Sequence, residues 1–264
     1  MLQHTRIIAA AVAIALMLAG TATAAPSAPS AEALEKAFDA AAEYDWGDDR
    51  GPLKPIDQAV VAAADDAELR TTLEQKLIAV VEGDGSLAAK DYACRKLSLV
   101  GSPECVPVAA ALLPDEKLSH MGRYILERVP GEEAVAALRG GLEKTKGLQQ
   151  VGVINSLGVR RDTESIDALA GLLKSSDEQI AAAAVAALGN IGTPKAADAL
   201  GEFQDKAPEG LKVAAADAYL ACAEQLLADG EKLRALKIYK ALTGSKIKHV
   251  KLAATRGLLA AAKK

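Results

Sequence analysis

The residue types best suited to metal binding or partner contact are concentrated in one acidic loop, YDWGDDR at residues 44–50. A calcium loop needs several oxygen ligands at close alternating spacing, as in D-x-D-x-D-G. Asp45, Asp48 and Asp49 lack that spacing. The same residue types end one helix and cap the next, with Trp46 packed on the cap. We favour this capping interpretation and keep Trp46 as a candidate partner-binding residue, because aromatic anchors dominate protein interfaces.

The remaining sequence contains no catalytic or metal-binding motif. His120 and His249 each lack Cys, His or carboxylate neighbours at a zinc-like spacing with further ligands. Nucleophile-elbow, Walker and dinucleotide-binding patterns do not occur. The segment Arg160-Arg161-Asp162 could bind an anion, but a solvated turn with Asp162 capping the following helix is the simpler interpretation. We therefore expect no catalytic residue, no metal ligand and no cofactor.

Three cysteines raise the question of disulfides, which exported proteins can form. Cys94 and Cys105 are the only pair near each other in sequence. On a helical hairpin they would differ in height by roughly 6 Å at 1.5 Å per residue. Adding the separation of the helix axes exceeds the limit of about 7 Å between bridged Cα atoms. We expect Cys94, Cys105 and Cys222 to be reduced and buried, with a Cys94–Cys105 bridge as the alternative.

The first 24 residues have the pattern of a secretory signal peptide. Arg6 precedes an uncharged apolar run at residues 7–18, and Ala22-Thr23-Ala24 fits a small-x-small cleavage site. A membrane anchor is the alternative, but a spanning helix needs roughly 20 apolar residues. No cysteine follows the run to take a lipid. We expect a mature chain of residues 25–264, periplasmic or extracellular, without a membrane span.

Composition narrows the class of protein further. The formal net charge is −4, and removing residues 1–24 takes away one basic residue and no acidic one. This acidic balance argues against a nucleic-acid partner, whose phosphates require Lys and Arg. Hydrophobic residues make up 50% of the chain but aromatic residues only 3%. An Ala-rich, aliphatic composition without alternating strand patterns favours closely packed helices.

The elements that would position these residues repeat along the chain. Three apolar rows recur with spacings of 29, 31 and 31 residues. A period of this length is typical of a solenoid, in which each helical hairpin buries its apolar face against its neighbours. The rows are Leu97, Leu126, Leu157 and Leu188; Val106, Val135, Ile166 and Ala197; and Ala109, Leu138, Leu169 and Leu200.

Together with the N-terminal pattern, the rows predict three regions: a signal peptide at 1–24, a non-repeating helical cap at 25–86, and a repeat array at 87–264. The cap should hold three helices, the first running from Ala31 to Trp46 and stopping at Gly47. Each unit should have a first helix, a turn and a second helix, with turns at Gly101, Pro130, Arg161 and Gly192. The predicted units are 88–117, 118–147, 148–178, 179–210 and 211–264.

The repeated units resemble HEAT repeats, most clearly at IAAAAVAALGNIGTPKAADAL, residues 180–200. They are similar to the short repeats of phycobilisome-lyase-type HEAT proteins. Asp115 and Asp177 stand where that family often places an acidic residue before the first helix. The whole chain resembles exported bacterial HEAT-repeat proteins of undefined role. The resemblance implies an all-α, right-handed α-solenoid, which we expect to contain roughly ten to thirteen helices.

In HEAT arrays the second helices line the concave face, so their outward positions are the candidate partner-binding surface. In units two to four these positions are mostly small, with a few charges that could set register. The alternative is that Ala and Gly there only allow tight helix stacking. The candidates are Arg139, Gly140, Asp167, Gly171 and Lys174.

The expected function is therefore a non-enzymatic scaffold that binds a protein partner along this concave surface. The lyase-type resemblance leaves a second possibility, lyase- or chaperone-like handling of a cofactor or tetrapyrrole. A third is a purely structural component of the cell envelope. If the groove is not the site, the loop around Trp46 is the next candidate.

Overall fold

The computed structural model describes residues 28–263, and all the regular secondary structure within them is helical. Fourteen α-helices and three short 3-10 turns occur in this range, with no strand. The prediction of an all-α solenoid is confirmed, although the estimate of ten to thirteen helices was too low. The helices are α1 (Ala31–Glu43), α2 (Lys54–Ala62), α3 (Ala67–Glu82), α4 (Leu87–Val100), α5 (Val106–Ala111), α6 (Ser119–Leu126), α7 (Glu132–Lys144), α8 (Gly147–Arg160), α9 (Ile166–Leu172), α10 (Glu178–Ile191), α11 (Pro194–Gln204), α12 (Lys212–Ala228), α13 (Lys232–Leu242) and α14 (Lys248–Lys263).

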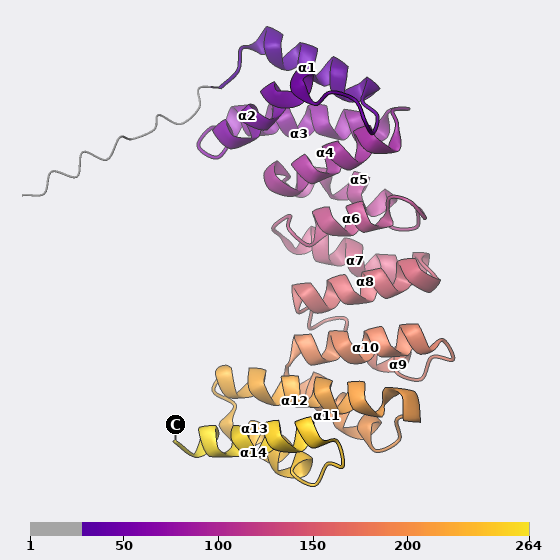
Figure 1. Ribbon diagram of the computed structural model, residues 1–264, viewed down its shortest axis with the longest axis vertical. Coiled ribbons are helices and arrows are strands. Elements are labelled where there is room, and N and C mark those ends of the chain that lie inside the picture. The colour runs from indigo at the N-terminus through magenta and orange to yellow at the C-terminus, as the bar shows by residue number, and fades with distance from the viewer. Residues whose placement is uncertain (1–27, 264) are drawn as a thin grey trace, which may run out of the picture.

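The helices form a column with α1 at one end and α14 at the other (Figure 1). We call α4, α6, α8, α10, α12 and α14 the first helices, because each packs on the next along the column. The second helices are α5, α7, α9, α11 and α13, which follow the first helices along the chain. Contacts of α5 with α7 and of α9 with α11 build a second layer. The core lies between these layers, where Leu97, Leu126, Leu157 and Leu188 are all fully buried.

Two glycines allow close stacking of the first helices. A Cβ atom on Gly158 of α8 would lie 2.8 Å from Ala187 Cα of α10. A Cβ atom on Gly189 would lie 3.0 Å from Ala218 Cα of α12. Real side chains do not tolerate such distances to backbone atoms, so these interfaces require glycine. The two glycines are 31 residues apart and repeat the same contact in successive units.

The turns between helices follow the predicted row. Arg161 and Gly192 end α8 and α10 in the left-handed region, with φ of 53° and 64°. Gly101 ends α4 in extended backbone, and Pro130 is followed by Gly131 with φ of 101°. Each turn reverses the chain so that the second helix can pack back on the first.

Helix caps set the starts of several helices, as the acidic residues indicate. Asp177 accepts hydrogen bonds from the backbone N–H groups of Gln179 and Ile180 at the start of α10. Asp115 accepts from two backbone N–H groups just before α6. The predicted end of the first helix was wrong: α1 stops at Glu43, and Tyr44 is already extended. Three residues later Gly47 has φ of 101°, so it shapes the loop and does not cap the helix.

Two predictions about how the chain is divided into regions stay predictions. The signal peptide at residues 1–24 lies outside the described residues. The boundary between cap and array falls between α3 and α4, which pack extensively on each other, and it stays a prediction. Within residues 28–263, no helix combines the length and apolar character needed to cross a membrane.

Candidate functional site

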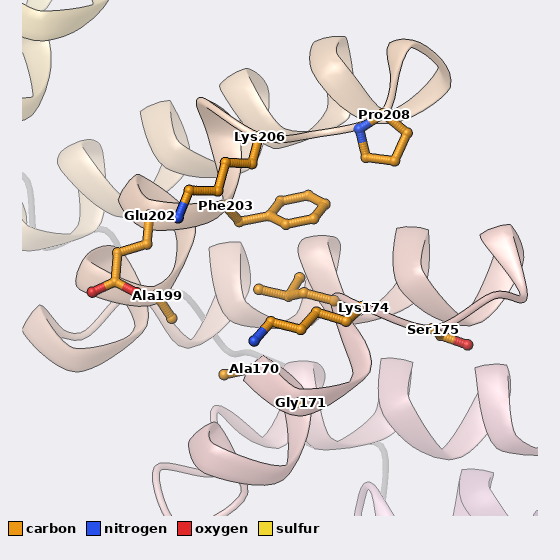
Figure 2. A pocket seen from close by; sticks show the side chains of 10 residues that line it. Ala170, Gly171, Lys174, Ser175, Ala199, Glu202, Phe203, Lys206 and Pro208 are labelled. Carbon is orange, nitrogen blue, oxygen red and sulfur yellow. The ribbon is translucent and has the colours of Figure 1, made fainter.

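A pocket of about 560 Å³ opens between the second helices α9 and α11 (Figure 2). Predicted site residues Gly171 and Lys174 form one wall, at the end of α9. Phe203 lies on the facing wall, at the end of α11. The full lining is Ala170, Gly171, Leu173, Lys174, Ser175, Ala199, Glu202, Phe203, Lys206 and Pro208.

The depth of this pocket comes from a contrast in side-chain size. A Cβ atom on Gly171 would meet nothing within 4 Å, so the α9 wall is open at backbone level. Leu173 is buried and gives the pocket an apolar floor. Phe203 is half-buried and packs against the core from the side of α11. A partner side chain can therefore contact apolar atoms without displacing a residue of the chain.

Charged groups border the apolar part of the pocket. The ends of Lys174, Glu202 and Lys206 lie toward the same side of it (Figure 2). All three residues are exposed, and none of them forms an ion pair with another described residue. These charges need no rearrangement of the fold before they contact a partner.

Arg139, a predicted partner-binding residue, is engaged in ion pairs within the chain. Its guanidinium pairs with Glu132 and Glu164, and it lies 3.7 Å from Asp162. Its side chain is only 20% exposed. Three carboxylates thus surround Arg139, which links α7 to the turn before α9, and its role in partner binding stays a prediction.

Asp167 is also engaged, although it remains on the surface. Its carboxylate accepts a hydrogen bond from Lys195 Nζ at 2.6 Å, which links α9 to α11. Asp198 pairs with Arg234 at 3.5 Å and links α11 to α13 in the same way. Such exposed pairs contribute little to stability. They link neighbouring second helices, and Asp167 stays exposed.

The glycines of the second-helix layer differ from those of the first helices. Gly140 and Gly171 are 31 residues apart, and neither would bring a Cβ atom within 4 Å of another group. Tight stacking therefore does not explain these two positions, whereas it does explain Gly158 and Gly189. Both second-helix glycines are exposed, as the sequence predicts, but only Gly171 borders the pocket.

Trp46 lies in a loop at the other end of the column. The loop is held by Asp48, which accepts from Asp45 N at 2.8 Å, and by Asp49, which accepts from Gly51 N at 2.9 Å. These carboxylates brace the loop itself, and neither caps α1 or α2, so the capping interpretation and the expectation that Trp46 packs on the cap were wrong. Trp46 is 66% exposed, because the loop turns its ring outward. It precedes α2, far along the column from α9 and α11 (Figure 1).

The turn at residues 160–162 is not simply solvated. Arg160 donates to the carbonyls of Val129 and Gly131, at 2.9 and 3.0 Å, in the turn of the preceding unit. Arg161 donates to the carbonyl of Ile191, at 3.2 Å, in the turn of the next unit. Asp162 accepts from Ser165 N at 3.0 Å, which agrees with its predicted capping role. The two arginines therefore join three successive turns, and neither is free for an anion.

The histidines and thiols offer no further site among the described residues. His249 contacts Asp217 at 2.7 Å, and His120 lies 4.0 Å from Asp91. Within residues 28–263, no three His, Cys, Asp or Glu side chains come together as metal ligands would. The three cysteines are buried and unpaired, and burial raises the pKa of each thiol to about 12.

The sequence prediction missed the apolar part of the pocket. Phe203 occupies the repeat position of Leu112, Gly141 and Leu172, a row that we did not consider for binding. This row is partly buried at Leu112, Leu172 and Phe203, so it borders both core and surface. Phe203 is one of only two phenylalanines in the chain, and its bulk at a repeat position that elsewhere holds smaller residues is the signal that was available.

This architecture of helical hairpins stacked in two layers defines an α-solenoid. Residues 148–219, from α8 into α12, match the family of HEAT repeats, so this part of the column is a HEAT-repeat solenoid. No curated protein sequence matches the chain. Human deoxyhypusine hydroxylase in complex with glycerol is among the solved structures that match, at 16% identity and a TM-score of 0.34, covering 71% of this chain and 96% of that one. A similarity this weak does not bear on the function.

Proposed function

We propose that the chain is a non-enzymatic scaffold that binds an extended segment of a partner protein on the second helices α9 and α11. The pocket next to Gly171 carries this proposal. Its volume of about 560 Å³ lies within the range of roughly 300–1,000 Å³ that is usual for ligand sites. Solenoids commonly use such extended surfaces to bind other proteins.

The lining suggests the chemistry of the bound segment. An apolar side chain of the partner would pack against Leu173 and Phe203, where contact with water is lost. Lys174 and Lys206 would pair with acidic residues beside it, while Glu202 would discourage a second acidic group on its own side. Charges at the edge of such a site influence specificity and association rate more than affinity.

We also propose that the scaffold works outside the cytoplasm, in the periplasm or beyond the cell. The sequence of residues 1–24 supports this location through its basic start, apolar run and small-residue cleavage site. Mass spectrometry of the N-terminus of the chain purified from its native host tests the proposal. A chain that begins at Ala25 supports export, and an intact residue 1–24 segment contradicts it.

The binding proposal is tested with two variants at the same repeat position. Gly171→Trp fills the pocket mouth, whereas Gly140→Trp places an equal bulk at an exposed glycine that does not border the pocket. We expect crosslinked partner capture to fall at least about tenfold for Gly171→Trp and to persist for Gly140→Trp. Thermal unfolding should show a cost on the order of 1 kcal/mol or less for each, as for other exposed sites.

Equal capture by both folded variants would contradict the assignment of the pocket. Arg139→Glu is not a useful probe, because it would place a carboxylate among Glu132, Asp162 and Glu164 and disturb the fold. A stoichiometric chromophore in the visible spectrum of the purified chain would favour cofactor handling over partner binding.

A further inference from the structure

Charge is distributed very unevenly between the two ends of the column. Residues 232–264 contain ten Lys and Arg and no Asp or Glu. Residues 31–66 contain ten Asp and Glu but only three Lys and Arg. These segments form opposite ends of the column, with α13 and α14 at one end and α1 and α2 at the other (Figure 1). The net charge of the whole chain, −4, conceals this separation.

The outer face of α14 combines cations with exposed leucines. Val250, Ala254 and Ala261 are buried on one side of the helix, where it packs on α12 and α13. The helical period places Leu252 and Leu259 on the opposite side, and they are 59% and 62% exposed. The exposed cations Lys248, Lys251 and Arg256 accompany them, and none forms an ion pair with another described residue.

This face has no neighbour among the described residues. Every earlier first helix, from α4 to α12, is covered by the next first helix in the column. Helix α14 packs on the preceding first helix, α12, as those helices do, but no further helix follows it within residues 28–263. Its outer face, with the leucines and cations named above, is therefore left exposed among the described residues.

The outer face of α1 has the complementary chemistry. Leu34, Ala37, Phe38 and Ala41 are buried on its inner side. The helical period places four carboxylates on the opposite side, and all four residues are exposed: Glu32, Glu35, Asp39 and Glu43. Two of them form exposed pairs with Lys36 and Lys76, while Asp39 and Glu43 form no ion pair with a described residue.

We infer that the chain associates with itself head to tail, the α14 face of one copy docking on the α1 face of the next. At 1.5 Å per residue, the 16-residue α14 and the 13-residue α1 are about 24 and 20 Å long, so the two faces match in length. The cations would pair with Asp39 and Glu43, while Leu252 and Leu259 would lose contact with water. Because the two faces differ, the contact is heterologous and can continue from copy to copy.

An anionic membrane surface is the other occupant that a basic helix with exposed leucines could accept. Such a surface would use only the basic end and would leave the acidic face of α1 without a role. A second copy uses both ends, so the charge separation favours self-association.

The test measures sedimentation of the mature chain at micromolar concentrations and above, in low salt. We expect concentration-dependent assemblies that dissociate at about 1 M salt, where the Debye length is about 3 Å. Lys248→Glu/Lys251→Glu and Asp39→Lys/Glu43→Lys should each weaken self-association at least tenfold. Mixing the two variants should restore association, because their reversed faces are again complementary.

The matched control is Lys117→Glu/Lys146→Glu, which removes two exposed cations from loops in the middle of the column. It should associate like the parent, and circular dichroism should show that all variants keep their helices. A parent chain that stays monomeric, or association that neither reversal weakens, overturns the inference. Binding of anionic phosphatidylglycerol vesicles by a monomeric parent, lost in Lys248→Glu/Lys251→Glu, also overturns it and assigns the basic end to a lipid surface.

Discussion

At the scale of single residues, Arg139 and Lys174 show how strongly the surroundings decide a role. Both are cations of the second-helix layer. Arg139 is 20% exposed and surrounded by three carboxylates, so its charge is balanced by ion pairs within the chain. Lys174 is exposed, pairs with no described residue and borders a pocket. Of these two cations, only Lys174 is free of ion pairs with other described residues.

The thiols give a prediction at this scale. Burial raises the pKa of Cys94, Cys105 and Cys222 from 9.0 to about 12. At about pH 8, close to the ordinary pKa of a thiol, we expect maleimide to label none of them until the chain is unfolded in denaturant. Mass spectrometry of the native and the unfolded chain measures this. Rapid native labelling, or a Cys94–Cys105 bridge, would contradict it.

The same pKa shift makes stability depend on pH. Above pH 9 the unfolded chain loses its thiol protons while the folded chain keeps them up to about pH 12. Deprotonation therefore favours the unfolded state, and the free energy of unfolding should fall as the pH rises through this window. Replacing the three cysteines by alanine should reduce that fall in urea unfolding measured on either side of pH 9.

At the scale of helices, the glycines separate stacking surfaces from open ones. Gly158 and Gly189 lie where the backbones of adjacent first helices approach each other. Gly140 and Gly171 lie on second helices with no neighbouring atom within reach of a Cβ. One residue type thus serves two purposes, and only the neighbouring helix distinguishes them.

Matched substitutions test this distinction. Gly189→Leu would force a side chain into the backbone of α12 at Ala218, and overpacking of this kind costs typically 1–3 kcal/mol. Gly171→Leu should be neutral or stabilising by up to about 1 kcal/mol, because leucine favours a helix more than glycine does. Urea unfolding of both variants measures the difference. A Gly189→Leu chain as stable as Gly171→Leu would contradict the close approach of α10 and α12.

At the scale of the whole molecule, each unit contacts mainly its neighbours, so disturbances should remain local. Arg160 joins the turn after α8 to the turn before α7 through the carbonyls of Val129 and Gly131. Arg161 extends the link to the turn before α11 through the carbonyl of Ile191. The turns thus form a chain of hydrogen bonds along one edge of the column.

Removing one link tests how far such coupling reaches. Arg160→Ala leaves the two carbonyls without their charged donor, and charged hydrogen bonds contribute about 1.5–3 kcal/mol. We expect faster amide hydrogen exchange in residues 127–133 and 160–166 and unchanged exchange in α1 to α3. Exchange monitored by mass spectrometry provides both readouts. Faster exchange along the whole column would show that the chain unfolds as one unit.

Local patterns in the sequence were sufficient to predict the class of fold. Leu97, Leu126, Leu157 and Leu188 recur at a nearly constant spacing, and a recurring apolar row can be buried only by stacking equivalent hairpins. Asp177 and Gly192 mark helix ends through hydrogen bonds and backbone conformations that involve a few adjacent residues. The exposure of Gly171 and Lys174 followed from the same period.

Tertiary structure decided what these positions can do, because the deciding contacts join residues from different helices. Glu164 reaches Arg139 across 25 residues and binds its guanidinium. Phe203 faces Gly171 only after α11 packs on α9, and the pocket exists only because of that packing. Trp46 is exposed because of the path of its loop, which residue types alone do not specify. Periodicity determines which side of a helix is buried, whereas the neighbouring helix determines which exposed residues remain free.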